Sequence, residues 1–177
     1  AIDWHLAHYG AMGSSGAGLM CVEATHVSAQ GRITHGCLGL YSDANEAALK
    51  RVVDWCRAWM PSTKLAIQIA HAGRKASAQR PWKGGGPLTA ADAPDTPWST
   101  ISASAIPFDA TGPGVGFQGG VPAQLPAAKW HTPVALDRVG MDRVKAEFVD
   151  ATERARRLGF EVLELHGAHG YFLHQFL

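Results

Sequence analysis

The chain has 177 residues, a formal net charge of +1 and 46% hydrophobic residues, which suits one globular domain or part of a larger one. A charge this close to zero argues against nucleic acid or an anionic membrane as the main partner. No apolar run approaches the roughly 18 residues that a membrane span needs, and nothing resembles a signal peptide. Three cysteines without CxxC spacing argue against a disulfide framework or a zinc cluster, and cytoplasmic localisation is expected.

The first segments alternate between helical and extended patterns. Residues Asp3 to Met12 have the pattern of a helix, and Ala17 to Ala24 form an apolar run that is typical of a buried strand. A longer helix is predicted over Asp43 to Met60, where Asp43 and Glu46 have capping-box spacing, with Asp replacing the usual Ser or Thr. The residues expected on the apolar face of this helix are Leu49, Val52, Val53, Cys56 and Trp59.

A second strand and a long irregular segment follow. Lys64 to His71 (KLAIQIAH) is predicted as a strand. Residues 74–133 hold nine of the ten prolines of the chain, together with several glycine clusters. Loops of this length are usually functional or disordered, and scattered aromatic residues argue against disorder here. We expect a lid over the strand ends, and a partner-facing excursion is the alternative.

The last part of the chain returns to the alternating pattern. Met141 to Leu158 is predicted as a helix that ends at Gly159 in a left-handed conformation. Glu161 to His166 is predicted as the third strand. Strands that alternate with helices indicate an α/β fold with parallel βα units, in a (β/α)₈ TIM barrel or a doubly wound sheet.

The segment after the third strand carries the candidate chemistry. His166 and His169 are three residues apart, and Tyr171 follows two residues later. Ligands bind beyond the carboxyl ends of parallel strands, so these side chains would lie where such a fold keeps its active site. Two imidazoles can donate hydrogen bonds to a carbonyl oxygen, and a phenol can supply a proton.

From spacing alone, the histidines allow other interpretations. His166, His169 and His174 could bind zinc, although catalytic zinc sites usually need three protein ligands and often include a carboxylate. Glu164 would lie on the face of His166, but about 6.5 Å deeper along the strand. Structural histidines without a ligand are the third interpretation.

Gln68 is the candidate on the second strand. Alternation places it on the same face as Ala66 and Ala70 and opposite to His71. Small neighbours leave space for a flat ligand beside the amide, whereas a hydrogen-bonded core glutamine is the alternative. Taken alone, Ala24 would be a packing residue.

Four segments occur in order along the chain, GLMCVEATHVSAQGRITHGCLGLYSD, IQIAHAGRKAS, RPW and GFEVLELHGAHGYFLHQFL. Together they resemble the Old Yellow Enzyme family of FMN-dependent ene-reductases. The HAGRKA and HxxHxY forms are similar to its thermophilic-like and xenobiotic-reductase branch. The resemblance covers nearly the whole chain, and the Pro/Gly-rich loop is the least similar part.

The resemblance implies a (β/α)₈ barrel with FMN at the carboxyl ends of the strands. The three predicted strands would be its second, third and fourth, with the lid loop after the third. Ala24 would lie against the flavin, and Gln68 would hydrogen-bond its pyrimidine edge. His166 and His169 would hold the carbonyl oxygen of an α,β-unsaturated substrate, and Tyr171 matches the proton donor of the family.

The implied reaction uses NAD(P)H to reduce FMN, after which the enone receives hydride from flavin N5 at Cβ and a proton from Tyr171 at Cα. Hydride arrival builds enolate charge on the carbonyl oxygen, so two donors aimed there gain strength in the transition state. Tyrosine, with an ordinary pKa of about 10, is protonated at pH 7. The chain has no dinucleotide fingerprint, so the sequence does not distinguish NADH from NADPH.

The resemblance also implies parts that these residues do not contain. The first strand would precede Ala1, and the phosphate-binding loops would follow Leu177. We therefore expect residues 1–177 to form part of an FMN oxidoreductase barrel, completed by the missing half from the same or another chain, and to be unstable and inactive alone. A homo-oligomer remains compatible with the sequence. The alternatives are a larger flavin/iron–sulfur reductase of the dienoyl-CoA type, a metal-dependent barrel hydrolase, and an inactive fragment or interaction scaffold.

Overall fold

The structure, a computed structural model, describes residues 1–109, 117–118, 121–122 and 129–177. The chain divides into two compact units, of which the first contains the long strands and most of the helical residues. The first unit comprises Ala1–Ala29, Leu38–Ala70 and Met141–His166, and the second comprises Gln30–Cys37, His71–Gly140 and Gly167–Leu177.

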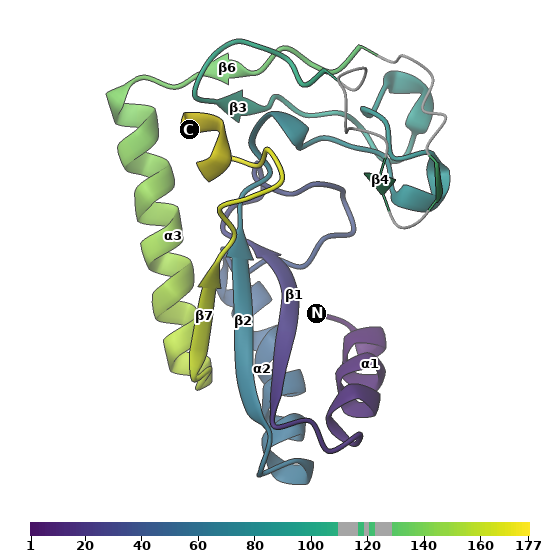
Figure 1. Cartoon of the computed structure of the whole chain (residues 1–177), viewed down its shortest axis with the longest axis vertical. Helices are drawn as coiled ribbons and strands as arrows, with labels where there is room; N and C mark the ends of the chain where they lie inside the picture. Colours follow the sequence, from purple (N-terminus) through teal and green to yellow (C-terminus); the bar gives the residue numbers. More distant parts are fainter. Residues whose placement is uncertain (110–116, 119–120, 123–128) are drawn as a thin grey trace. The chain divides into compact units, whose positions relative to one another are not determined.

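A three-stranded parallel sheet forms the centre of the first unit (Figure 1). Its strands are β1 (Leu19–His26), β2 (Lys64–Ala70) and β7 (Val162–Leu165), and they lie in that order. The β1–β2 and β2–β7 pairs are both parallel. Helical segments connect the strands along the chain, so the predicted parallel βα units are confirmed, and the strand bounds differ from the predicted ones by at most two residues.

Three long helices lie close to their predicted positions, α1 (Asp3–Gly13), α2 (Asp43–Trp59) and α3 (Arg138–Leu158). The predicted start of α3 is wrong by three residues. The carboxylate of Asp137 accepts a hydrogen bond from the backbone N–H of Gly140 at 2.8 Å, which stabilises an earlier first turn. At the other end Gly159 has φ +85°, so the predicted left-handed cap is confirmed.

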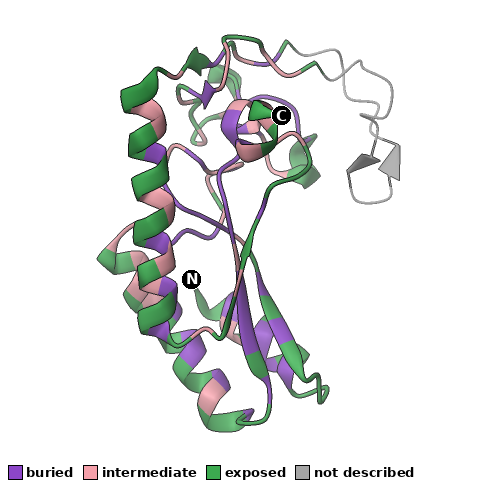
Figure 2. Ribbon diagram, turned by 60° about the vertical axis from the view of Figure 1, so that its left-hand side comes forward, coloured by how far each residue is buried: buried purple, intermediate pink, exposed green. Residues whose placement is uncertain are grey.

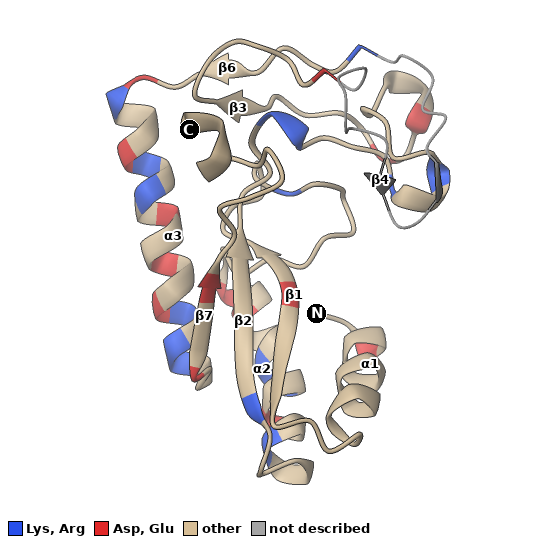
Figure 3. Ribbon diagram, in the orientation of Figure 1, with Lys and Arg blue, Asp and Glu red and all other residues tan. Residues whose placement is uncertain are grey.

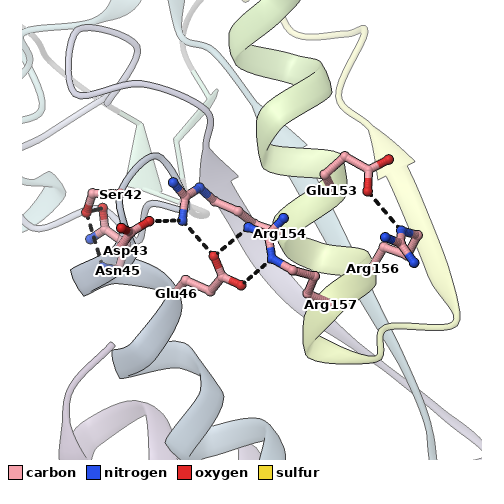
Figure 4. A network of polar contacts seen from close by, with 8 residues as sticks. All are labelled: Ser42, Asp43, Asn45, Glu46, Glu153, Arg154, Arg156 and Arg157. Carbon is pink, nitrogen blue, oxygen red and sulfur yellow. Dashed lines mark hydrogen bonds and ion pairs between the residues drawn. The ribbon is translucent and has the colours of Figure 1, made fainter.

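The predicted capping box at the start of α2 is wrong. Ser42, and not Asp43, is the N-cap residue, because its hydroxyl accepts a hydrogen bond from the backbone N–H three residues on, at 3.2 Å. Instead of forming a capping box with Asp43, the carboxylate of Glu46 accepts hydrogen bonds from Arg154 and Arg157 of α3 at 2.6–2.9 Å (Figure 4). These guanidinium groups, Arg157 foremost, lower the pKa of the Glu46 carboxyl. The network links α2 to α3.

The helices of the first unit contribute to one hydrophobic core on one face of the sheet. Alternate residues of the strands, such as Val22 and Ile67, share this core with Leu49 of α2 and Ala151 of α3. In a (β/α)₈ barrel the helices cover the same face of the sheet throughout, whereas in a doubly wound sheet the helices of the two halves cover opposite faces. One predicted core residue is wrong, since Trp59 ends α2 and its side chain is 72% exposed.

The second unit has little regular structure. Most of the predicted loop over residues 74–133 belongs to it, and residues 110–116, 119–120 and 123–128 of that prediction lie outside the described residues. Within the described part, Leu88 and Trp130 are buried, so this segment has packed side chains of its own. Figure 2 colours the chain by burial. Its elements are η1 (Gly73–Lys75), η2 (Pro81–Lys83), η3 (Ala90–Asp92), η4 (Leu173–Phe176) and the short pairs β3 (Ile101–Ser102) with β6 (Val134–Ala135) and β4 (Phe117–Gln118) with β5 (Val121–Pro122).

In the part of the chain that the structure describes, no helix is long and apolar enough to cross a membrane.

Candidate functional site

A β-bulge in β1 brings two of the predicted site residues next to each other. Glu23 and Ala24 of β1 stand opposite the single residue Gln68 of β2. The N–H of Glu23 donates to the hydroxyl of Tyr9 at 3.1 Å, and the same hydroxyl donates to the Glu23 carboxylate at 3.3 Å. Bulges change the direction of the side chains that follow them and are frequent beside active sites. The sequence pattern did not reveal this bulge, because the pattern contains no information on register.

The side-chain amide of Gln68 is held by its neighbour on β7. Gln68 and Glu164 are register partners, and Nε2 of Gln68 donates to Oε1 of Glu164 at 2.9 Å. Acidic residues occur on β1 and β7, which flank β2 (Figure 3). By strand alternation, Ala66 and Ala70 lie on the same face as Gln68. This face therefore presents one oriented amide between small side chains.

His166 follows β7 in the first unit. Its backbone N–H donates to the carbonyl oxygen of Ile69 at 3.0 Å, which continues the strand pairing one residue beyond β7. Its side chain is buried, at 9% exposure. Alternation from Glu164 assigns it to the face of Gln68. In the first unit, Gln68 and His166 thus share the face opposite to the core residue Ile67, and Ala24 stands opposite Gln68 at the bulge.

His169 and Tyr171 lie together in the second unit. Their ring centroids are 6.5 Å apart, with an interplanar angle of 89°. His169 has φ +58°, which is uncommon for a residue other than glycine. Its carbonyl oxygen accepts a hydrogen bond from Nζ of Lys75 at 2.8 Å. Lys75 therefore stabilises the turn that carries the histidine and the phenol.

Tyr171 lines a pocket of about 40 Å³, together with Lys75, Phe108 and Trp130. Nζ of Lys75 lies 4.1 Å from the ring centroid of Phe108 and 5.8 Å from that of Tyr171. Burial raises the pKa of the Tyr171 phenol, and Cys37 adds to this shift. Burial also lowers the pKa of the Lys75 ammonium, with a contribution from Arg74. The phenol is therefore protonated at neutral pH and can act as an acid.

Gln175 connects the two histidine-containing motifs and was not predicted as a site residue. Its Oε1 accepts hydrogen bonds from Oγ of Ser102 at 2.8 Å and from the backbone N–H of Arg74 at 3.3 Å. Its Nε2 donates to the carbonyl oxygen of Gly170 at 2.7 Å. Gly73 has φ +60°, and an added Cβ would lie 2.5 Å from this Nε2. The glutamine of the HQF segment therefore occupies the space that a side chain at position 73 of the HAGRK segment would need.

The remaining histidines near the site have structural contacts. Nδ1 of His71 accepts a hydrogen bond from the backbone N–H of Gly73 at 3.0 Å, and a Cβ added to Gly31 would lie 2.5 Å from its ring. Nδ1 of His174 accepts from the N–H of Gly170 at 2.9 Å. Within the described part of the chain, no group of three His, Cys, Asp or Glu side chains could hold a metal ion.

Comparison with known proteins identifies a family. All 177 residues match the family described as NADH:flavin oxidoreductase / NADH oxidase. The chain is 38% identical to an NADH:flavin oxidoreductase of Gibberella zeae and 37% identical to an NADPH dehydrogenase of Listeria monocytogenes, each over all 177 residues. It spans 38% and 41% of these two relatives, respectively.

Solved structures agree with the sequence comparison. Morphinone reductase is 30% identical and superposes with a TM-score of 0.69 over 98% of this chain and 41% of its own. Morphinone reductase in complex with tetrahydroNAD is 27% identical, with a TM-score of 0.68 over 98% of this chain and 42% of its own. The predicted fold class, an α/β fold that is part of a (β/α)₈ barrel, is confirmed.

Proposed function

Because the chain belongs to the NADH:flavin oxidoreductase / NADH oxidase family over its whole length, we propose that it forms part of an FMN-dependent enzyme that uses NAD(P)H to reduce the C=C bond of α,β-unsaturated carbonyl compounds. Relatives named NADPH dehydrogenase and a morphinone reductase complex with tetrahydroNAD support a nicotinamide reductant. The curated relatives are longer than this chain, which supports a barrel completed by protein outside residues 1–177.

The residues of the first unit fit an isoalloxazine ring. A flat ring system needs a surface without long side chains, and Ala24, Ala66 and Ala70 supply small ones around Gln68. The amide of Gln68 can hydrogen-bond the pyrimidine edge, which alternates carbonyl oxygens with an N–H group. Bound FMN would supply the hydride, while the chain positions the ring and the substrate.

The observation that carries the proposal is the half-buried Tyr171 beside His169. A phenol whose pKa is raised above its ordinary value keeps its proton at neutral pH and can deliver it to the substrate carbon. His169 and His166 are the proposed donors to the carbonyl oxygen. Donors placed there stabilise developing enolate charge.

We propose that the segment over residues 74–133 covers the substrate. The described part of the segment over residues 74–133 supplies Phe108 and Trp130 beside Tyr171, which supports its role as a lid over an apolar substrate.

Cys21, Cys37 and Cys56 are free thiols, which supports a location in a reducing compartment such as the cytoplasm.

The test separates the two halves of the reaction in the flavin-loaded protein. Tyr171→Phe removes the phenolic hydroxyl and keeps the aromatic ring, so reduction of the flavin by NADPH should keep its rate. Reoxidation by cyclohexenone should slow by about 10²- to 10⁴-fold, the usual contribution of a general acid. Equal enone reduction by the variant and the parent protein would overturn the assignment of Tyr171. Absence of flavin from the parent protein with its barrel completed would overturn the proposed function itself.

A further inference from the structure

The pairing of Gln68 with Glu164 goes beyond what the proposed flavin site requires, and the inference rests on that site. We propose that Glu164 is a positioning residue that fixes the side-chain amide of Gln68. The amide NH₂ is held by Glu164, and the amide oxygen is thereby presented to the flavin. In this arrangement the cofactor is recognised through its N3–H group rather than through a ring carbonyl.

The direction of the amide follows from the chemistry of the pair. A glutamate carboxylate can only accept hydrogen bonds, whereas a glutamine amide has a donor side and an acceptor side. Of the two ends of the Gln68 amide, only Nε2 can therefore bond Oε1 of Glu164, and the two atoms are 2.9 Å apart. The planar amide then directs its oxygen away from Glu164. Gln68 is only half-buried, so part of its side chain is accessible on this face.

The register between β2 and β7 places Glu164 beside Gln68. Gln68 and Glu164 are direct register partners on adjacent parallel strands, so their side chains leave the sheet on the same face. Burial raises the pKa of the Cys21 thiol on β1, and the negative charge of Glu164 is the second-largest cause of this rise. Both effects place the carboxylate on the face that carries the candidate flavin contacts.

The neighbours of Gln68 on β2 have no polar side-chain atom that could orient its amide. Ala66 and Ala70 precede and follow it on this face, and neither has a polar side-chain atom. Of the two residues at the bulge opposite Gln68, Ala24 has none either, and the carboxylate of Glu23 accepts a hydrogen bond from the hydroxyl of Tyr9. Without Glu164 the amide could rotate by half a turn and offer NH₂ instead of oxygen. The site would then lose its preference for N–H over C=O on the pyrimidine edge.

The test uses the protein loaded with ¹⁵N-labelled FMN and follows the N3–H signal by NMR. Gln68→Leu marks the signal position when the acceptor is missing. Glu164→Gln keeps the size of the side chain but can donate as well as accept, so the signal should move towards that of Gln68→Leu. FMN binding should weaken by about 3- to 10-fold, as expected for one hydrogen bond. Glu161→Gln, the same change on a glutamate that pairs with Arg57, should leave the signal unchanged.

A double variant with Gln68→Glu and Glu164→Gln provides a rescue. The carboxylate introduced at position 68 can only accept, so it should restore the N3–H hydrogen bond and the parent signal position. Restoration supports the proposal even if Glu164→Gln alone fails to retain FMN. An unchanged signal in Glu164→Gln, or no restoration in the double variant, would overturn the positioning role. An unmoved signal in Gln68→Leu would instead remove Gln68 from the flavin, and a parent protein without FMN would contradict the proposed function.

Discussion

Substitution of Gly73 by alanine perturbs the contact between the HAGRK and HQF segments. Gly73 has φ +60°, and its added Cβ would overlap the side-chain amide of Gln175. The left-handed backbone alone costs about 1 kcal/mol for an alanine. Gln175 must also withdraw from Ser102, Arg74 and Gly170, and lost hydrogen bonds cost roughly 1 kcal/mol each. We expect Gly73→Ala to lower the free energy of unfolding by about 2–4 kcal/mol.

Gly16→Ala is the matched control for this prediction. Gly16 has φ +84°, but an added Cβ would meet no atom within 4 Å. This variant should therefore lose only the backbone contribution of about 1 kcal/mol. Urea denaturation of both variants, followed by circular dichroism, measures the difference. A second check is Gly73→Ala combined with Gln175→Ala, which should be less destabilised than the sum of the single variants. Equal losses for the two glycine variants, or strict additivity, would refute the role of Gln175.

Two further predictions concern stability. Tyr9→Phe removes the hydroxyl that accepts the hydrogen bond from the Glu23 N–H at the bulge, so the free energy of unfolding should fall by about 1–3 kcal/mol. The flavin absorption spectrum should also change, because Ala24 moves with the bulge. Urea denaturation and absorbance measure the two effects, and unchanged values would refute the role of Tyr9. The hydrogen bond from Arg57 lowers the pKa of the Glu161 carboxyl from 4.5 to about 2, so the stabilisation it provides is complete above pH 4.5 and is lost as the pH falls towards 2. Denaturation midpoints between pH 2 and 7 should show this loss in the parent protein but not in Glu161→Gln.

The predictable part of the fold is the part set by periodicity within one segment. The spacing of Leu49, Val52 and Val53 is that of a buried helix face, and the apolar run from Leu65 to Ile69 is that of a central strand, so both elements were found close to their bounds. The motif around His166 and Tyr171 could be recognised because its residues are neighbours in sequence.

The other part depends on register and on contacts between distant segments. Glu164 could not be assigned to Gln68 because a one-residue shift between β2 and β7 would turn the two side chains to opposite faces. Gln175 meets Gly73 across about a hundred residues of chain, and no local pattern encodes that contact. Ser42 was missed as a cap because Asp43 offers an equally good spacing.

The proposed flavin site with its carbonyl-binding histidines is tested most directly by an absorption titration of the purified protein in which residues 1–177 are joined to the part that completes the barrel. We expect flavin bands and a saturable change in them when a simple phenol is added, since the phenol oxygen would accept hydrogen bonds from His166 and His169 over the flavin ring. His166→Ala should weaken phenol binding by about tenfold or more. A colourless protein, or flavin bands that phenol leaves unchanged, would contradict the account.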